Sequence, residues 1–331
     1  MKKASTRVGL DIGSCNIKAI EVEENNGSIR LINACIKEIK QEKNLPAQIN
    51  ELFKQACISG RKVNISVSGE NTVSRYLSLP KMTDSELKRA MEFQLEDHIP
   101  FKPEEVYVDY HILGEDENAL NKVRLFLVAS KKDLIDTRIK LLKQAGLETQ
   151  VITTDVLALK NTFYFNYPSK AASNITLLNI GGRLTNILIS KEQIPYFLRD
   201  ARFGGESITA SIQSILQLER SNAESLKQNP GASTTQVPEI IKSSLSNLLN
   251  EIFVSLDFYE NLTEQRIDEV YISGGSSQLA GLKEFLGGYL NLPILPLEPF
   301  KNFSPSGIPK ETLSKLSPFM AVAVGLALEK P

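Results

Sequence analysis

Three glycine-containing turns follow short apolar segments of the chain, and their residue types suit the binding of a phosphate group. The turns are Asp11-Ile12-Gly13-Ser14, Asn179-Ile180-Gly181-Gly182 and Ser273-Gly274-Gly275-Ser276. Glycine allows a sharp turn and brings backbone N–H groups close to a ligand, which creates a concave site for an anion. One such turn is typical of an ordinary hairpin. Three of them favour a site that grips a phosphate chain, where an acidic side chain at a strand end would hold magnesium through water.

The segments around the first two turns repeat one order of elements: strand, glycine turn, strand, strand, helix. The first copy lies within residues 1–60, with strands expected at 7–12, 16–23 and 28–35. The second copy has strands expected at 174–180, 185–190 and 194–202. Internal duplication of this kind predicts two similar lobes that face each other across a cleft, where ligands commonly bind.

Between the two copies, the sequence predicts a small α+β insert. A capping box formed by Thr83 and Glu86 opens a helix, and two strands and a second helix follow before Gly146. Such a segment is long enough to bury one face of a small sheet. Its aromatic residues either pack in that core or form a groove for a partner: Phe93, Phe101, Tyr107 and Tyr110.

Composition excludes several classes of protein. The 331 residues are 42% hydrophobic, which suffices for a substantial core and about two domains. The net charge of -1 argues against a general nucleic-acid surface and against attachment to acidic lipid by charge alone. No segment reaches the roughly 20 apolar residues that span a bilayer, and the best candidate, 318–328, is expected to be a buried helix. We therefore expect a soluble protein that meets membranes only through a partner.

The cysteines do not predict a metal site. Cys15, Cys35 and Cys57 are widely spaced, and only two histidines accompany them. We expect all three to be small buried hydrophobic residues in a reducing compartment, the cytoplasm.

At the three turns, the sequence resembles the actin, Hsp70 and hexokinase superfamily. Val8–Ile20 (VGLDIGSCNIKAI) resembles its phosphate-1 motif, Leu178–Thr209 its phosphate-2 motif and Val270–Leu282 (VYISGGSSQLAGL) its adenosine motif. The linking segments are more specific, because Glu96–Leu113, Leu127–Leu159 and the ending SPFMAVAVGLAL are similar to the PilM family of type IV pilus assembly proteins, relatives of the cell-division protein FtsA. The resemblance covers almost the whole chain.

The resemblance implies an α/β fold of the two-lobed, actin-like (ribonuclease H-like) kind, with duplicated subdomains and a small inserted α+β subdomain as in FtsA. The first lobe is expected at 1–79, completed by 150–172 and 315–331, and the insert at 80–149. The second lobe is expected at 173–206 and 266–314, with a helical subdomain at 207–265.

The resemblance also implies roles for individual residues. Asp11 is similar to the residue that orders Mg²⁺ through water. The residues implied to line the phosphate loops are Gly13, Ser14, Asn16 and Lys18 in the first loop and Asn179, Gly181, Gly182 and Thr185 in the second. The residues implied to lie beneath and beside the nucleoside are Gly204 and Gly205 at a helix start, Glu224 and Lys227 at the ribose and adenine, and Gly274, Gly275 and Ser276.

The residues at two positions bear on whether the protein hydrolyses ATP. Asp155 lies where relatives carry an acidic group near the attacking water, and a helix N-cap explains an aspartate there equally well. Relatives usually carry aspartate where this chain has Asn179. Asparagine has an acceptor oxygen but no charge, so it attracts a metal less, whereas backbone donors still cradle phosphate. We therefore expect ATP and Mg²⁺ to bind, with slow turnover or none.

Three functions are compatible with an actin-like fold for this sequence. The resemblance favours a cytoplasmic adaptor of type IV pilus assembly and twitching motility, recruited to the inner face of the cytoplasmic membrane. It would bind ATP between its lobes, and the N-terminal cytoplasmic peptide of a PilN-like membrane protein in a groove between the first lobe and the insert. Other inner-membrane pilus components are further partners, and self-association stays open.

The alternatives fit the residues less well. A small-molecule kinase would need a catalytic aspartate in a substrate pocket, and no residue clearly fits that role. A filament-forming protein like FtsA usually ends in a basic amphipathic membrane helix, whereas this sequence stops at Leu328-Glu329-Lys330-Pro331.

Overall fold

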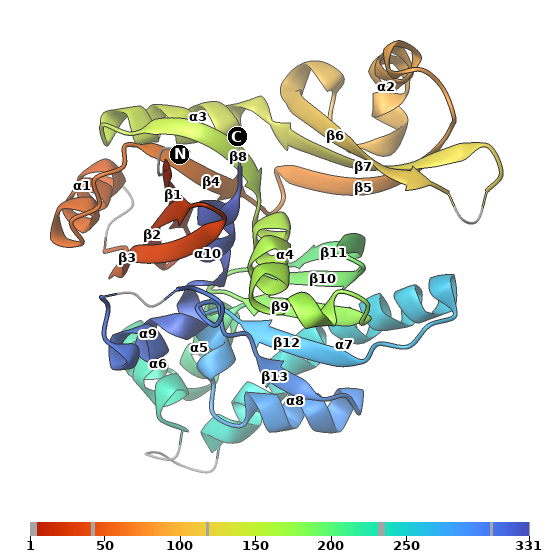
Figure 1. Ribbon diagram of the computed structural model, residues 1–331. Coiled ribbons are helices and arrows are strands. Elements are labelled where there is room, and N and C mark those ends of the chain that lie inside the picture. The colour runs from red at the N-terminus through yellow and green to blue at the C-terminus, as the bar shows by residue number, and fades with distance from the viewer. Residues whose placement is uncertain (1–4, 41–43, 117–118, 231–235, 305–306, 331) are drawn as a thin grey trace. The chain divides into compact units, whose positions relative to one another are not determined.

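The computed structural model describes residues 5–40, 44–116, 119–230, 236–304 and 307–330. The chain forms two compact units, a larger one of Met1–Ser66 with Ala145–Pro331 and a smaller one of Val67–Gln144 (Figure 1). The larger unit contains two five-stranded sheets and the smaller a three-stranded sheet.

The first sheet of the larger unit has the strand order β3-β2-β1-β4-β8. Its strands, with the helix that precedes β4, are β1 (Ser5–Ile12), β2 (Asn16–Asn25), β3 (Ser28–Glu38), α1 (Leu45–Gln55), β4 (Lys62–Val67) and β8 (Glu148–Thr154). The first three strands are antiparallel, and β4 pairs with β1 in parallel. Asn26 and Gly27 have φ of 49° and 83°, which suits a tight hairpin between β2 and β3.

The second sheet repeats this arrangement in the order β11-β10-β9-β12-β13. Its strands are β9 (Ile175–Ile180), β10 (Thr185–Lys191), β11 (Ile194–Ala201), β12 (Glu269–Ser273) and β13 (Ile294–Pro296). Four helices accompany them: α5 (Gly205–Leu216), α6 (Arg220–Gln228), α7 (Gln236–Thr263) and α8 (Leu282–Leu290). Again three antiparallel strands are followed by parallel pairing of β12 with β9, so the predicted duplication is confirmed.

Two helices form the layer between these sheets. α4 (Asp155–Asn166) packs through Leu159 and Phe163 on the second sheet, and α10 (Ala321–Leu328) packs through Ala323 and Val324 on the first. Gly325 lies so close to α4 that an added Cβ would be 1.7 Å from the carbonyl oxygen of Ala158. The small residues of the last helix therefore allow close packing against α4. The short helix α9 (Lys310–Leu316) precedes this segment.

The smaller unit has the sheet order β5-β7-β6. Its elements are β5 (Thr72–Pro80), α2 (Asp84–His98), β6 (Val106–Glu115), β7 (Lys122–Lys131) and α3 (Lys132–Gln144). The capping box of Thr83 and Glu86 begins α2, as predicted, and α2 packs its apolar stripe on one face of the sheet. The boundary expected at residue 80 is wrong, because β5 pairs along its length with β7 and thus belongs to this sheet.

The aromatic residues of the smaller unit are not all part of its core. Phe101 and Tyr110 pack against its core, whereas Tyr107 is 48% exposed. The side chain of Phe93 lies outside the described residues.

The helix expected at 318–328 is buried: a short 3₁₀ turn at Ser317–Phe319 leads into α10, whose residues Ala321–Ala327 are all inside the larger unit. Across the described ranges, no single helix has the length and hydropathy to cross a bilayer. One pair of consecutive helices in these ranges, Lys310–Phe319 and Ala321–Leu328, has sufficient combined length and hydropathy, but the pair is bent by 95°.

Candidate functional site

The β1–β2 hairpin brings together two residues implied for the site. Asp11 and Lys18 are direct cross-strand neighbours, and Lys18 Nζ lies 2.7 Å from Asp11 Oδ2. The hairpin closes when the N–H of Gly13 donates to the carbonyl of Asn16 at 3.0 Å. An added Cβ on Gly13 would lie 3.0 Å from Lys18 Nζ. Because Gly13 has no side chain, the ammonium group of Lys18 and the carboxylate of Asp11 can both lie beside the first phosphate loop.

The second phosphate loop, between β9 and β10, touches the first. A Cβ on Gly182 would lie 2.5 Å from Cys15 Sγ and 2.6 Å from Ser14 Oγ. The N–H groups of Gly205 and Glu206 donate to the carbonyls of Gly181 and Gly182, so helix α5 begins directly on this loop. The two loops and the start of α5 therefore form one continuous backbone surface.

The third glycine turn completes this surface. Gly274 has φ of 88°, and a Cβ there would lie 2.3 Å from the carbonyl oxygen of Ile180, which only glycine accommodates. Ser276 Oγ donates to the carbonyl of Gly181 at 2.8 Å. A Cβ on Gly205 would lie 2.5 Å from that hydroxyl. The second of the turns that the sequence singled out thus contacts both of the others, although the three lie far apart along the chain.

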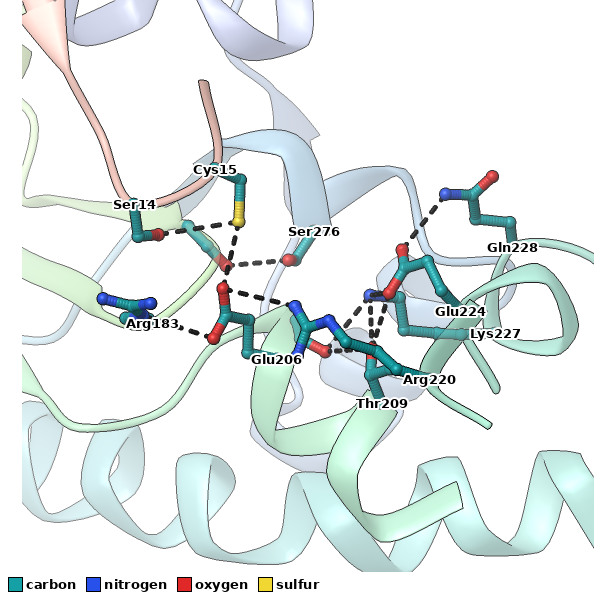
Figure 2. Close-up of polar contacts among 12 residues, drawn as sticks. Ser14, Cys15, Arg183, Glu206, Thr209, Arg220, Glu224, Lys227, Gln228 and Ser276 are labelled. Carbon is teal, nitrogen blue, oxygen red and sulfur yellow. Dashed lines mark hydrogen bonds and ion pairs between the residues drawn. The ribbon is translucent and has the colours of Figure 1, made fainter. Parts of the chain in front are cut away.

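Lys227 and Glu224, the residues implied at the adenine and ribose, form a compact cluster beside Gly205 (Figure 2). Lys227 Nζ donates to Thr209 Oγ1 at 2.9 Å and to Glu224 Oε2 at 2.7 Å. Partial burial opposes ionisation of Glu224, but hydrogen bonds from Lys227 and Thr209 outweigh it and hold the pKa of this carboxyl below its usual value. Glu224 is therefore an anion at neutral pH, paired with the Lys227 cation.

Asn179 is part of a polar ladder across three strands. Its Nδ2 donates to Asn186 Oδ1 at 2.8 Å, and Asn186 Nδ2 donates to Asp200 Oδ1 at 2.8 Å. Ser273 Oγ lies 3.4 Å from Asn179 Oδ1. The amide is therefore held by its neighbours in the sheet, and an aspartate could not donate the first of these bonds.

Four residues that the sequence did not assign also lie at the junction of the loops. Cys15 Sγ donates to Glu206 Oε1 at 3.3 Å, and Arg183 and Arg220 approach the same carboxylate (Figure 2). Arg183 and Glu206 occur inside the quoted phosphate-2 segment. Nothing in their spacing distinguishes them from surface charges, because their partners come from other parts of the chain.

Other sequence predictions need correction. Thr185 is buried and its hydroxyl donates to the carbonyl of Phe203 at 2.9 Å, so it supports the second loop from beneath instead of lining it. The N-cap of α4 is Thr154, and Asp155 is the first helical residue. The cysteines are not uniformly buried: Cys57 is exposed, while Cys15 and Cys35 are partly buried.

These residues suit a phosphate chain better than they suit a metal ion. The glycines allow the turns to pack closely against one another, and Lys18 and Lys227 supply positive charge beside them. Within the described part of the chain, no group of three or more His, Cys, Asp and Glu side chains could hold a metal ion. A magnesium ion here would depend on Asp11, through water, and on phosphate oxygens of the nucleotide.

Comparison with known proteins gives one family. The family described as Type IV pilus assembly protein PilM matches residues 9–331. The cell division protein FtsA of Streptococcus pneumoniae is 22% identical over 254 residues, which are 67% of this chain and 55% of that protein. This chain therefore matches about half the length of that relative.

Two solved structures show the fold. The PilM-PilN type IV pilus biogenesis complex superposes with a TM-score of 0.88 and 24% identity over 97% of both chains. MreB5 of Spiroplasma citri bound to AMPPNP superposes with a TM-score of 0.52 and 10% identity over 97% of this chain and 94% of that one. The chain thus has the actin-like fold, with duplicated subdomains and an inserted small unit.

Proposed function

Because the chain belongs to the PilM family of type IV pilus assembly proteins, we propose that it is an ATP-binding adaptor of a pilus assembly machine. In this proposal ATP lies against the three glycine turns, and a PilN-like membrane protein binds the adaptor through its N-terminal cytoplasmic peptide. The partner would recruit the adaptor from the cytoplasm to the inner face of the membrane. Bound nucleotide would favour one arrangement of the chain and so bias partner binding, which requires different partner affinities with and without nucleotide.

The contact among the three glycine turns is the observation that carries the nucleotide proposal. Gly182, Gly205 and Gly274 each lie so close to a neighbouring turn that a Cβ would overlap it. Lys18 would neutralise phosphate charge, and Glu224 with Lys227 would hold the ribose and adenine. The triphosphate of ATP is an anionic chain, which is the kind of group that this surface suits. The solved structure of MreB5, on the same fold, contains a nucleotide analogue.

The same geometry favours binding over turnover. Asn179 carries no charge, and its side-chain amide donates a hydrogen bond to Asn186 on the neighbouring strand. Asp11 is paired with Lys18. Asp155, the proposed water-positioning residue, begins helix α4. With one carboxylate for metal and no second charge at position 179, phosphoryl transfer lacks part of the metal stabilisation that it needs, so slow hydrolysis or none is expected.

Replacing Lys18 with methionine is expected to weaken ATP binding about ten-fold. The change removes one charge-assisted hydrogen bond to phosphate and leaves Asp11 as an uncompensated negative charge in the loop. Titration calorimetry of the full chain with ATP and Mg²⁺ measures this. Lys315→Met, which removes an exposed lysine paired with Glu311 on α9, is the matched control. Equal affinity in wild type and Lys18→Met would contradict the proposed role of the loop.

The smaller unit offers a surface for the peptide. β6 is an edge strand, and it exposes three apolar side chains: Tyr107 (48%), Val108 (37%) and Ile112 (41%). An edge strand presents unpaired backbone groups with which an extended peptide can pair, and neighbouring apolar side chains add specificity. The structure of a PilM-PilN complex supports a PilN-like protein as the source of that peptide.

Tyr107→Ser combined with Ile112→Ser is expected to lower the affinity for a PilN-like N-terminal peptide at least about ten-fold, because two apolar anchors are lost. Fluorescence anisotropy of the labelled peptide measures it. Tyr289→Ser, at an equally exposed site on α8, should leave affinity unchanged. If the double variant binds as tightly as wild type, the peptide does not use β6.

A further inference from the structure

Glu206 is the meeting point of three segments around the phosphate loops. Its Oε1 accepts from Cys15 Sγ of the first loop at 3.3 Å, and its Oε2 accepts from Arg183 Nε of the second loop at 3.2 Å (Figure 2). Arg220 Nη2, at the start of α6, lies 3.6 Å from Oε1. One carboxylate is therefore surrounded by a thiol and two guanidinium groups.

The backbone fixes Glu206 in this place. It is the second residue of α5, and its N–H donates to the carbonyl of Gly182 at 2.8 Å. A Cβ on Gly204 would lie 2.4 Å from that same carbonyl oxygen, so glycine at this position lets the helix start lie directly against the loop. Burial raises the pKa of the Cys15 thiol, which keeps the proton that it donates to Glu206. The carboxylate is thus held at the junction of the loops.

Guanidinium groups are preferred ligands of phosphate as well as of carboxylate. Arg183 follows Gly182 of the second loop, so a phosphate chain that follows the two loops would pass close to the guanidinium groups that Glu206 already engages. Each added phosphate must then compete with the Glu206 carboxylate for these cations, and the anions repel each other. A diphosphate, with one phosphate group fewer, experiences less of this competition.

We propose that Glu206 is a specificity-determining residue that lowers affinity for nucleoside triphosphates relative to diphosphates, by holding Arg183 and Arg220 on its own carboxylate. The proposal rests on the nucleotide site proposed above and goes beyond it, because it assigns the discrimination between the two ligands to one side chain. Glu206 has a side chain that is 25% exposed, so solvent screening limits the effect to about ten-fold.

The test compares ATP and ADP binding, each with Mg²⁺, to the wild-type chain and to Glu206→Gln by titration calorimetry. The glutamine keeps the shape and removes the charge. The expected result is ATP affinity about ten-fold higher in Glu206→Gln, with ADP affinity changed less than about two-fold. Arg183→Gln is expected to act in the opposite direction and weaken ATP selectively. Glu284→Gln, an exposed residue of α8, removes the same charge elsewhere and should change neither affinity.

The outcomes separate this inference from the nucleotide site itself. Equal shifts for ATP and ADP, or no shift in Glu206→Gln while wild type binds both ligands, would overturn the role of Glu206 and leave the nucleotide site standing. If Glu206→Gln unfolds at a lower temperature than wild type, the Arg183→Gln variant tests the proposal instead. The proposal still requires that this variant lose affinity for ATP and not for ADP. Absence of binding of either nucleotide to wild type would refute the site and the inference together.

Discussion

Replacing Gly325 with alanine is expected to lower the free energy of unfolding by roughly 3 kcal/mol or more. The new Cβ would lie 1.7 Å from the carbonyl oxygen and 2.4 Å from the carbonyl carbon of Ala158. These are backbone atoms of α4, which cannot rotate away as a side chain can. Gly9 of β1 also approaches α10 closely, with its added Cβ 2.2 Å from the carbonyl oxygen of Ala323. The helix is therefore confined between α4 and the first sheet.

Urea unfolding of the full chain, followed by circular dichroism, measures this loss. Gly288→Ala in α8 is the matched control, because nothing lies within 4 Å of an added Cβ there. Alanine also favours the helix over glycine, so this control is expected to be neutral or about 0.5–1 kcal/mol more stable. An unchanged unfolding midpoint for Gly325→Ala would show that α4 and α10 are not in close contact in solution.

Asn179→Asp is expected to destabilise the protein by about 2 kcal/mol and to make ATP binding depend on Mg²⁺. The aspartate adds a negative charge at this position, which attracts the metal. It cannot donate to Asn186 Oδ1, however, and places a carboxylate against that acceptor oxygen. Asn186 is 2% exposed, so water does not replace the lost bond. Unfolding in urea and ATP titrations with and without Mg²⁺ measure the two effects.

A compensating variant tests this explanation. In Asn179→Asp combined with Asp200→Asn, the amide of Asn186 can turn over, donate to position 179 and accept from position 200. The net charge is that of wild type, and the ladder is restored in the reverse direction. Most of the lost stability should return, while the Mg²⁺ dependence remains. If the double variant is as unstable as the single one, the ladder is not the cause of the loss.

Features that depend on neighbours close in sequence could be predicted. The Asn26–Gly27 hairpin, the capping box at Thr83 and the duplicated strand order follow from propensities and spacings within a few residues. The pairing of Asp11 with Lys18 belongs to the same class, because one tight hairpin places them opposite each other.

Predictions at the edges of elements were less successful. From the sequence, residues up to 79 were expected in the first lobe, whereas β5 pairs with β7 of the smaller unit, because the sequence of a strand does not specify which strand pairs with it. Thr185 matches a motif, yet its hydroxyl turns inward to Phe203, 18 residues away.

By itself, the sequence determined the fold class, the family and the glycine turns, because short-range geometry requires those residue types where they stand. Only the tertiary structure decided what surrounds the turns. Cys15 meets Glu206 across 191 positions of the chain, and Ser276 meets Gly181 across 95. Such contacts depend on how buried surfaces pack, and many sequences with the same local pattern would pack differently. The cluster of charges around Glu206 therefore became visible only in the folded chain.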